Sequence, residues 1–168
     1  MAIAKATGNL SFKVLPDEMR KRFNGTSSFT GIDANDKWVY DKVQVTYNKD
    51  NILSTSNDYL MSPTTSVAIG DKYKWIMLKH TGYTDSNETT TVSSIGVMIV
   101  IDAGTPAYNA TDLIFLAPGD TTVLKLPNCT VDDLHARTCK ILAGVPSADG
   151  VSGDNVLLEV AAILDDVA

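Results

Sequence analysis

Hydrophobic and polar residues alternate in several segments, and the clearest pattern lies between residues 73 and 102. From Tyr73 to His80 every second residue shares a face, so Tyr73, Trp75, Met77 and Lys79 oppose Lys74, Ile76, Leu78 and His80. After a polar loop, Thr81–Thr91, the segment Val92–Asp102 contains the almost unbroken apolar run 95–101. Alternation is typical of a half-buried strand, and a short β-branched run is typical of a strand covered on both faces. This centre predicts the inner wall of a β-sandwich, with Val97 and Ile99 in its core.

Similar patterns predict further strands along the chain. In full, the predicted strands are Leu10–Leu15, Trp38–Tyr47, Ser66–Ile69, Tyr73–His80, Val92–Asp102, Asp112–Leu116, Thr121–Leu126, His135–Leu142 and Asn155–Leu164. Pro118-Gly119 suits a type II turn, which makes a hairpin or a bent strand of its two flanking segments. The last segment alternates as a strand does, although its Glu-Val-Ala-Ala-Ile-Leu would also suit a helix. Short strands with turn residues between them predict an all-β fold, an antiparallel two-sheet sandwich with the jelly roll as the favoured topology.

Little helix is expected, under roughly a fifth of the residues compared with the usual third. One helical turn is predicted at Asp17–Phe23, and another at Thr130–Asp133, where Thr and Asp are spaced as in a capping box. The small, polar residues Met1–Asn9 predict an extended, loose arm. Surface loops are predicted at 24–37, 48–65, 81–91 and 143–154, which are rich in Gly, Ser, Thr, Asn and Asp.

The length of 168 residues indicates one domain. Within it, residues 1–37 are expected to form an arm, a first strand and a loop that pack on a β-sandwich body at 38–168. The N-terminus lacks the apolar core of a signal peptide, and no stretch reaches the roughly 18 apolar residues of a membrane helix. The sequence therefore predicts a soluble protein made in a cytosol, with no membrane partner.

The net charge of −6 and a pI near 4.7 argue against general binding to nucleic acid, which requires a basic surface. The charge is uneven. Residues 1–42 hold seven Lys/Arg and five Asp/Glu, a net +2, whereas residues 43–168 hold seven and fifteen, a net −8. A basic leading segment suits docking on an acidic protein surface, although simple solubility also accounts for the acidic body.

No motif for catalysis is present. The two histidines, His80 and His135, lie near Asp85 and Asp133 in sequence, but a nucleophilic triad also needs an exposed Ser, and no G-x-S-x-G occurs. A histidine at a strand end usually serves as a structural hydrogen-bonding group. The sequence therefore predicts a protein that is not an enzyme.

Metal and cofactor sites are not expected either. Cys129 and Cys139 are too few for a disulfide framework or a zinc site, so free buried thiols are the better interpretation, although a hairpin across 130–138 would bring them together. Three oxygen-rich loops, Asp33–Asp36, Asp85–Glu88 and Asp149–Asp154, do not match the EF-hand pattern and suit Asx turns equally well. Five aromatic residues leave a sugar-binding face open, although core packing is their default role; they are Trp38, Tyr40, Tyr47, Trp75 and Tyr83.

Several segments resemble those of small virion proteins, in particular the jelly-roll decoration (cement) proteins of tailed phages. The segments are Trp75–Asp85, Leu116–Thr121, Val131–Ala136 and Leu158–Leu164. The resemblance implies a non-enzymatic protein, often a trimer, that binds the major capsid protein on the outside of an icosahedral head assembled in the host cytoplasm.

The expected capsid contacts are the N-terminal arm, with Met1 and Lys5, and the basic turn Arg20, Lys21 and Arg22, because an arm can pair with a sheet edge and basic side chains steer it to an acidic shell. The main alternative is a carbohydrate- or receptor-binding module of a phage tail or fibre, or a bacterial lectin. A cupin-like enzyme comes third, because its histidine cluster is missing.

Overall fold

The fold is described from a computed structural model, which defines residues 5–13, 22–30, 36–48, 50–53, 60–62, 66–101 and 114–166. The chain divides into two compact units, residues 1–35 and residues 36–168, and each is described by itself. The boundary lies close to residue 37, where the sequence predicts the end of the N-terminal segment. That this segment packs on the body stays a prediction.

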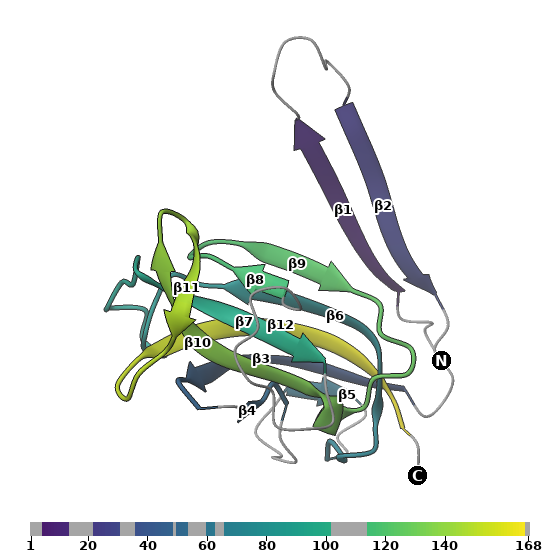
Figure 1. Ribbon diagram of the computed structural model, residues 1–168. Coiled ribbons are helices and arrows are strands. Elements are labelled where there is room, and N and C mark those ends of the chain that lie inside the picture. The colour runs from purple at the N-terminus through teal and green to yellow at the C-terminus, as the bar shows by residue number, and fades with distance from the viewer. Residues whose placement is uncertain are drawn as a thin grey trace. The chain divides into compact units, whose positions relative to one another are not determined.

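The first unit contains a two-stranded antiparallel sheet (Figure 1). Its strands are β1 (Lys5–Lys13) and β2 (Arg22–Thr30), paired over all nine positions of each. This hairpin corrects three predictions. Residues 5–9 form a strand instead of a loose arm, residues 24–30 form a strand instead of a loop, and Arg22 and Phe23, the last two residues of the predicted helical turn, begin a strand.

The second unit, here called the body, is an antiparallel two-sheet sandwich, as the sequence predicts. Its strands are β3 (Asp36–Thr46), β4 (Asp50–Asn51), β5 (Leu60–Ser62), β6 (Lys72–His80), β7 (Ile95–Ile101), β8 (Ile114–Leu116), β9 (Thr121–Leu124), β10 (Leu134–Leu142), β11 (Val145–Asp149) and β12 (Asn155–Asp165). One sheet has the order β5-β3-β12-β6-β9, and the other has the order β11-β10-β7-β8, with β4 also beside β10. Figure 1 shows the C-terminal strand β12, in yellow, between β3 and β6.

The strand order is that of a jelly roll. Without the short additions β5 and β11, eight strands remain, and the first, last, third and sixth of them form one sheet. The second, seventh, fourth and fifth form the other, which is the arrangement of two interlocked Greek keys. β12 is therefore a strand, not a helix, and it has a neighbour on each side.

The core lies between the two sheets and is almost entirely aliphatic. β12 contributes its even-numbered apolar residues, the face that alternation predicts for it. Val97 and Ile99 of β7 enter the same core from the other sheet, also as predicted. The buried residues of β6, β7 and β12 that belong to this core are Tyr73, Ile76, Leu78, Val97, Ile99, Val156, Leu158, Val160, Ala162 and Leu164.

A β-bulge changes the predicted faces of β6. The pairing of β6 with β12 shifts between Ile163 and Leu164, so Ile163 pairs with Trp75 and Leu164 with Tyr73, which leaves Lys74 as the extra residue. Tyr73 therefore joins Ile76 and Leu78 in the core, whereas simple alternation places it on the face of Trp75. One inserted residue is enough to reverse the alternation, because strand side chains repeat with period two.

A buried ion pair stands at the start of β3. Lys37 Nζ lies 2.8 Å from Asp71 Oδ2 and 3.1 Å from Asp166 Oδ1, and it donates a 3.0 Å hydrogen bond to the carbonyl of Ser66. Burial by itself lowers the pKa of Lys37, but the two carboxylates outweigh it and the pKa is raised. Asp71 Oδ2 also accepts a bond from the backbone N–H of Ala68, so the pair ties β3 to the segment before β6. The sequence assigns Lys37 to a loop.

Two further differences concern connections. Residues 66–70 include no strand, although Val67 is buried; and the predicted loop 143–154 contains β11. The Pro118-Gly119 turn, with Gly119 at φ +90°, joins β8 in one sheet to β9 in the other, which agrees with the bent-strand alternative. The predicted capping box holds: Asp133 accepts hydrogen bonds from the backbone and side chain of Thr130 at the short 3₁₀ helix η2 (Val131–Asp133).

Candidate functional site

Two of the predicted contact residues fall on the β1–β2 hairpin. Lys5 is the first residue of β1, and Arg22 is the first residue of β2. Met1, Arg20 and Lys21 lie outside the described residues. The register places Lys13, which the sequence does not single out, directly opposite Arg22. The hairpin therefore holds Lys13 and Arg22 together at one end and Lys5 at the other.

The register alternates two kinds of pair along the hairpin. Four pairs hold its apolar residues: Ala6 with Phe29, Gly8 with Ser27, Leu10 with Gly25, and Phe12 with Phe23. The five pairs that alternate with them are polar or basic: Lys5 with Thr30, Thr7 with Ser28, Asn9 with Thr26, Ser11 with Asn24, and Lys13 with Arg22. Three of the four phenylalanines of the chain thus occur in pairs of the first kind. The pattern is visible in the sequence, but the Gly, Ser, Thr and Asn residues between the phenylalanines favour a loop.

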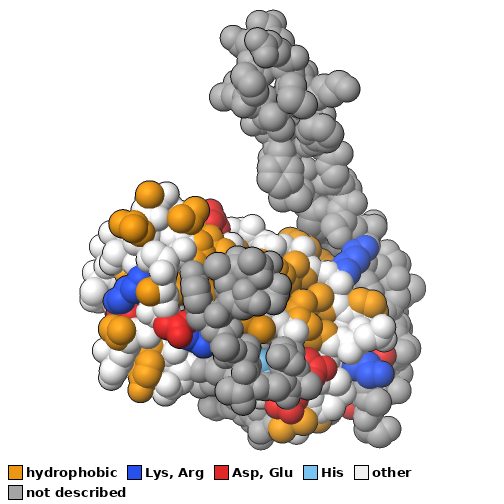
Figure 2. Space-filling view, viewed as in Figure 1, with side chains coloured by type: hydrophobic (Ala, Val, Ile, Leu, Met, Phe, Trp, Pro, Cys, Tyr) orange, Lys and Arg blue, Asp and Glu red, His pale blue; other side chains and the backbone are white. Residues whose placement is uncertain are grey.

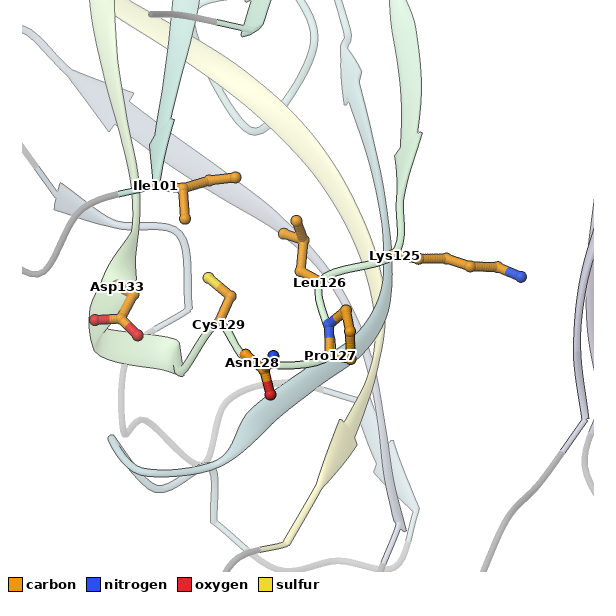
Figure 3. Close-up of a pocket in the computed structure, with 7 residues that line it drawn as sticks. All are labelled: Ile101, Lys125, Leu126, Pro127, Asn128, Cys129 and Asp133. Carbon is orange, nitrogen blue, oxygen red and sulfur yellow. The ribbon is translucent and has the colours of Figure 1, made fainter.

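The body carries an open hollow of about 410 Å³ at one end of the sandwich (Figure 3). Its lining comes from the end of β7 (Ile101), the segment after β9 (Lys125–Cys129) and η2 (Asp133). Figure 3 shows Ile101 and Leu126 pointing toward one another across the hollow, with the Cys129 thiol between them and Lys125 directed away. The lining is therefore mainly apolar, and Ile101 is 49% exposed.

Two titratable groups of the hollow have shifted pKa values. The hydrogen bonds from Thr130 to Asp133 lower the pKa of this carboxyl, so it is anionic at neutral pH. Burial raises the pKa of the Cys129 thiol to about 11, which keeps it protonated. A protonated thiol is a weak nucleophile. The hollow thus offers an apolar surface beside a negative charge, which suits binding more than covalent chemistry.

The histidines are not brought together. His80 lies in β6, where its Nδ1 accepts a 3.0 Å bond from the N–H of Gly82 and its Nε2 lies 3.1 Å from the carbonyl of Ile95. These partners assign the neutral tautomer with the proton on Nε2. Burial lowers the pKa of His80, against the smaller opposite effects of Ile95 and Asp120. The structural role predicted for a strand-end histidine is thus met by His80, while His135 is buried in β10 of the other sheet.

Two of the oxygen-rich loops are held together by their own carboxylates. Asp85 accepts bonds from the N–H groups of Asn87, Thr89 and Thr90, and the Thr90 bond is the largest cause of its lowered pKa. Asp154 accepts bonds from the N–H of Val151 and from Lys140. These are the Asx-type turns that the sequence allows. Among the described residues no group of three His, Cys, Asp or Glu is arranged to hold a metal ion.

Three of the five aromatic candidates for sugar binding share a face. Trp38 and Trp75 both pair with Ile163, so they lie in one row across β3, β12 and β6, and Tyr40 follows on β3. Trp75 is buried, however, and the hydroxyl of Tyr40 donates a 2.8 Å bond to Glu159. This row is thus occupied by packing and by an internal hydrogen bond.

Apolar side chains reach the surface of the body at several separate places (Figure 2). The exposed large ones are Tyr40, Tyr47, Ile69, Ile101, Leu142, Val145 and Val151. Of these, Ile101 lines the hollow. In the part of the chain that the structure describes, no helix is long and apolar enough to cross a membrane.

Comparison with known proteins gives one kind of similarity. No protein-family model matches the chain, and no curated protein matches it. Among solved structures, the coat protein of Tobacco streak virus in a C2 crystal form is similar, with 11% identity, a TM-score of 0.45, and coverage of 82% of this chain and 90% of that chain. A structure of the dimer of that coat protein is similar at 10% identity and a TM-score of 0.44, with the same coverage. The assignment of the jelly roll rests on the strand order given above.

Proposed function

We propose that this chain is a structural, non-enzymatic virion protein that binds the outer surface of a tailed-phage capsid and stabilises it as a decoration protein. The observation that carries the proposal is the β1–β2 hairpin, a unit separate from the body. Its eighteen paired residues include three basic residues and no acidic one. A basic ribbon of this kind is suited to contact an acidic protein shell.

The body supports the same proposal. It is a jelly roll with an aliphatic core, and its buried charged pair, Lys37 with Asp71, joins β3 to the segment before β6. His80, the histidine with assigned hydrogen-bond partners, is held by two backbone groups. Lys37, Asp71 and His80 therefore have structural partners, which fits a protein that binds a capsid and stabilises it. The segments that resemble decoration proteins include parts of β6, η2, β10 and β12, so the resemblance concerns the framework of the body.

The partner in this proposal is the major capsid protein, and the protein acts as a homo-oligomer, with a trimer as the favoured state. Linked copies raise the effective concentration of each contact, so a modest affinity per site gives firm attachment. The contact residues are Met1, Lys5, Arg20, Lys21 and Arg22, and the register adds Lys13 beside Arg22.

The test is co-sedimentation with phage heads that lack the protein. A variant with Lys5, Arg20, Lys21 and Arg22 changed to Ser is expected to lose at least about tenfold in affinity, and raised salt is expected to weaken the wild type, because exposed charges are screened. The control changes four body lysines to Ser: Lys42, Lys72, Lys79 and Lys125. It alters the net charge equally and is expected to bind as the wild type does.

Two outcomes would contradict the proposal at different levels. If the hairpin variant is folded and occupies heads as fully as the wild type, the contact residues are wrong. If the intact protein binds no head, the receptor- or sugar-binding alternative replaces the function itself.

A further inference from the structure

The strand β9 forms one edge of the body. In the sheet order β5-β3-β12-β6-β9 it comes last, so among the described residues β6 is the strand that pairs with it. Figure 1 shows β9 along the rim of the sandwich, beyond β6. The unpaired backbone groups of a strand edge are a template for pairing with another chain. The edge of β9 is therefore a candidate interaction surface.

The hydrogen bonds of β6 define which backbone groups of β9 point outward. The N–H of His80 donates a 2.9 Å bond to the carbonyl of Asp120, in line with the pairing of Lys79 with Thr121. Residues along an antiparallel pair alternate between bonding to the partner strand and pointing away from it. The N–H and C=O groups of Thr121 and Val123 therefore point away from β6, toward the rim of the sandwich.

β9 lacks the features that usually prevent strand edges from pairing, which are proline, charged side chains, β-bulges and very short strands. The edge strand β11 contains Pro146 and Asp149, and its pairing with β10 shifts register. The strands β4, β5 and β8 have only two or three residues each. In contrast, β9 has the sequence Thr-Thr-Val-Leu, which carries no charge and no proline and includes three β-branched residues. Its composition favours a strand and leaves its edge open to a partner.

We propose that β9 is an interface between two copies of this chain, in which the two β9 strands pair antiparallel about a two-fold axis at Thr122. In this register Thr121 of each copy pairs with Val123 of the other, so the outward N–H groups of one strand meet the outward C=O groups of the second. The inference does not rest on the capsid-binding function. A two-fold contact is also distinct from the contact that closes a trimer.

The residues of β9 identify a second copy as the partner, because a two-fold interface must be self-complementary and a residue at its axis meets itself. The axis residue is Thr122, so no like charges meet there, and opposed threonines form a favourable pair across strands. Asp120 falls opposite the uncharged Leu124 of the second copy. The carboxylate of Asp120 already accepts a 2.9 Å bond from the N–H of Ala117 in its own chain.

The charged groups beside β9 are also compatible with this register. Lys79 lies next to Thr121, and their row continues in the second copy into Val123 and Met77, which are uncharged. Lys79 Nζ lies 2.9 Å from Glu159 of its own chain. The register therefore places no lysine of one copy directly opposite a lysine of the other.

The first test measures the oligomeric state of the full chain by analytical ultracentrifugation from about 1 to 100 μM, a range that brackets micromolar affinities. The wild type is expected to associate with increasing concentration. Val123→Pro removes an outward N–H, a change that an edge strand tolerates, so the pairing with β6 is kept. It is expected to weaken association by at least about tenfold, because two symmetric hydrogen bonds are lost. Since a two-fold contact joins copies in pairs, its loss is expected to halve the mass of the largest species.

The matched control is Val123→Thr, which keeps the N–H and a β-branched side chain at the same position. It is expected to associate as the wild type does. Circular dichroism checks that both variants are folded.

A charge exchange at Thr122 tests the axis itself. Thr122→Lys and Thr122→Asp each place like charges opposite one another, so each variant alone is expected to associate at least about tenfold more weakly than the wild type. An equimolar mixture of the two variants places opposite charges together and is expected to restore association. This recovery requires residue 122 of one copy to meet residue 122 of the other.

A cysteine at the axis provides a direct cross-link. Directly opposite residues that do not share hydrogen bonds have Cα atoms about 4.5 Å apart, a spacing that a disulfide can bridge. Thr122→Cys is therefore expected to form a disulfide-linked dimer under mild oxidation. Ser147→Cys, at an exposed position of β11, is the matched control and is expected to cross-link far less. The native Cys129 and Cys139 are buried, so the wild type is expected to stay uncross-linked.

Three results would each overturn the inference. The first is a wild type whose mass does not change with concentration and that forms no dimer through Thr122→Cys. The second is association of folded Val123→Pro at the affinity of the wild type. The third is a mixture of the Thr122→Lys and Thr122→Asp variants that associates no better than either variant alone.

Discussion

Replacing Ile99 by Ala is expected to reduce the free energy of unfolding by about 3–4 kcal/mol. Ile99 is 1% exposed and lies in β7 between Ala136 of β10 and Ile114 of β8. The substitution removes about three methylene-sized groups, worth about 2.4 kcal/mol at ~0.8 kcal/mol each. Because β7 is paired on both sides, the strands cannot close fully around the missing atoms, and every 40 Å³ left unfilled adds about 1 kcal/mol.

Leu142→Ala is the matched control, because it removes the same number of carbon atoms from a residue that is 70% exposed at the end of β10. It is expected to cost under about 0.5 kcal/mol, as surface substitutions do. Urea unfolding at one fixed protein concentration measures both variants, since association shifts apparent stability. A loss below about 1 kcal/mol for Ile99→Ala, or similar losses for the two variants, would refute the placement of β7 in the centre of the core.

Three further predictions concern charged and titratable groups. Lys37→Met is expected to reduce the free energy of unfolding in urea by about 3 kcal/mol or more, because it leaves the buried Asp71 without its cation. Lys79→Met loses a more exposed pair with Glu159 and is expected to cost under about 1 kcal/mol. Equal losses for the two variants would show that burial does not make the Lys37 pair more important for stability. The pKa of His80 is lower in the folded protein, so the unfolded chain binds more protons below about pH 6.5 and the free energy of unfolding falls as the pH decreases from there toward the folded pKa. His80→Gln is expected to lose this pH dependence between pH 5 and 7. An unchanged slope of the free energy of unfolding against pH would contradict the prediction. Burial raises the pKa of Cys129 and of Cys139 to about 11, so neither thiol of the native protein is expected to react quickly with a disulfide reagent at pH 8, and both react after denaturation; rapid native reaction would show that they are accessible.

The body was predictable because its sequence patterns act locally. The alternation in β12 placed Val156, Leu158 and Val160 on one face, and the structure puts all three in the core. The capping box at Thr130 and the Pro118-Gly119 turn depend on residues within four positions of one another, so their geometry follows from a short stretch of sequence.

The predicted contact site stays a prediction, and the structure describes only part of it. The basic residues Lys5 and Arg22 could be selected from charge alone, and both lie in the hairpin strands. The pairing of Phe12 with Phe23 and of Lys13 with Arg22 could not be selected in this way, because it depends on which residue of β1 pairs with which residue of β2. The hollow was missed for a related reason: Ile101 and Leu126 lie twenty-five positions apart in sequence, and only the packing of the two sheets brings them to one place.

The sequence by itself determined that this protein is an antiparallel β-sandwich, which residues form its core strands, and where its turns stand, because period-two alternation and turn preferences are properties of neighbouring residues. Only the tertiary structure decided the rest. The bulge at Lys74 moves Tyr73 onto the core face of β6, through its pairing with β12. Lys37 becomes a buried ion because Asp71 and Asp166, distant in sequence, surround it. The polar residues at 5–9 and 24–30 become strands because each supplies the backbone hydrogen-bond partners of the other, and such pairing outweighs the weak preference of Gly, Ser and Asn for loops.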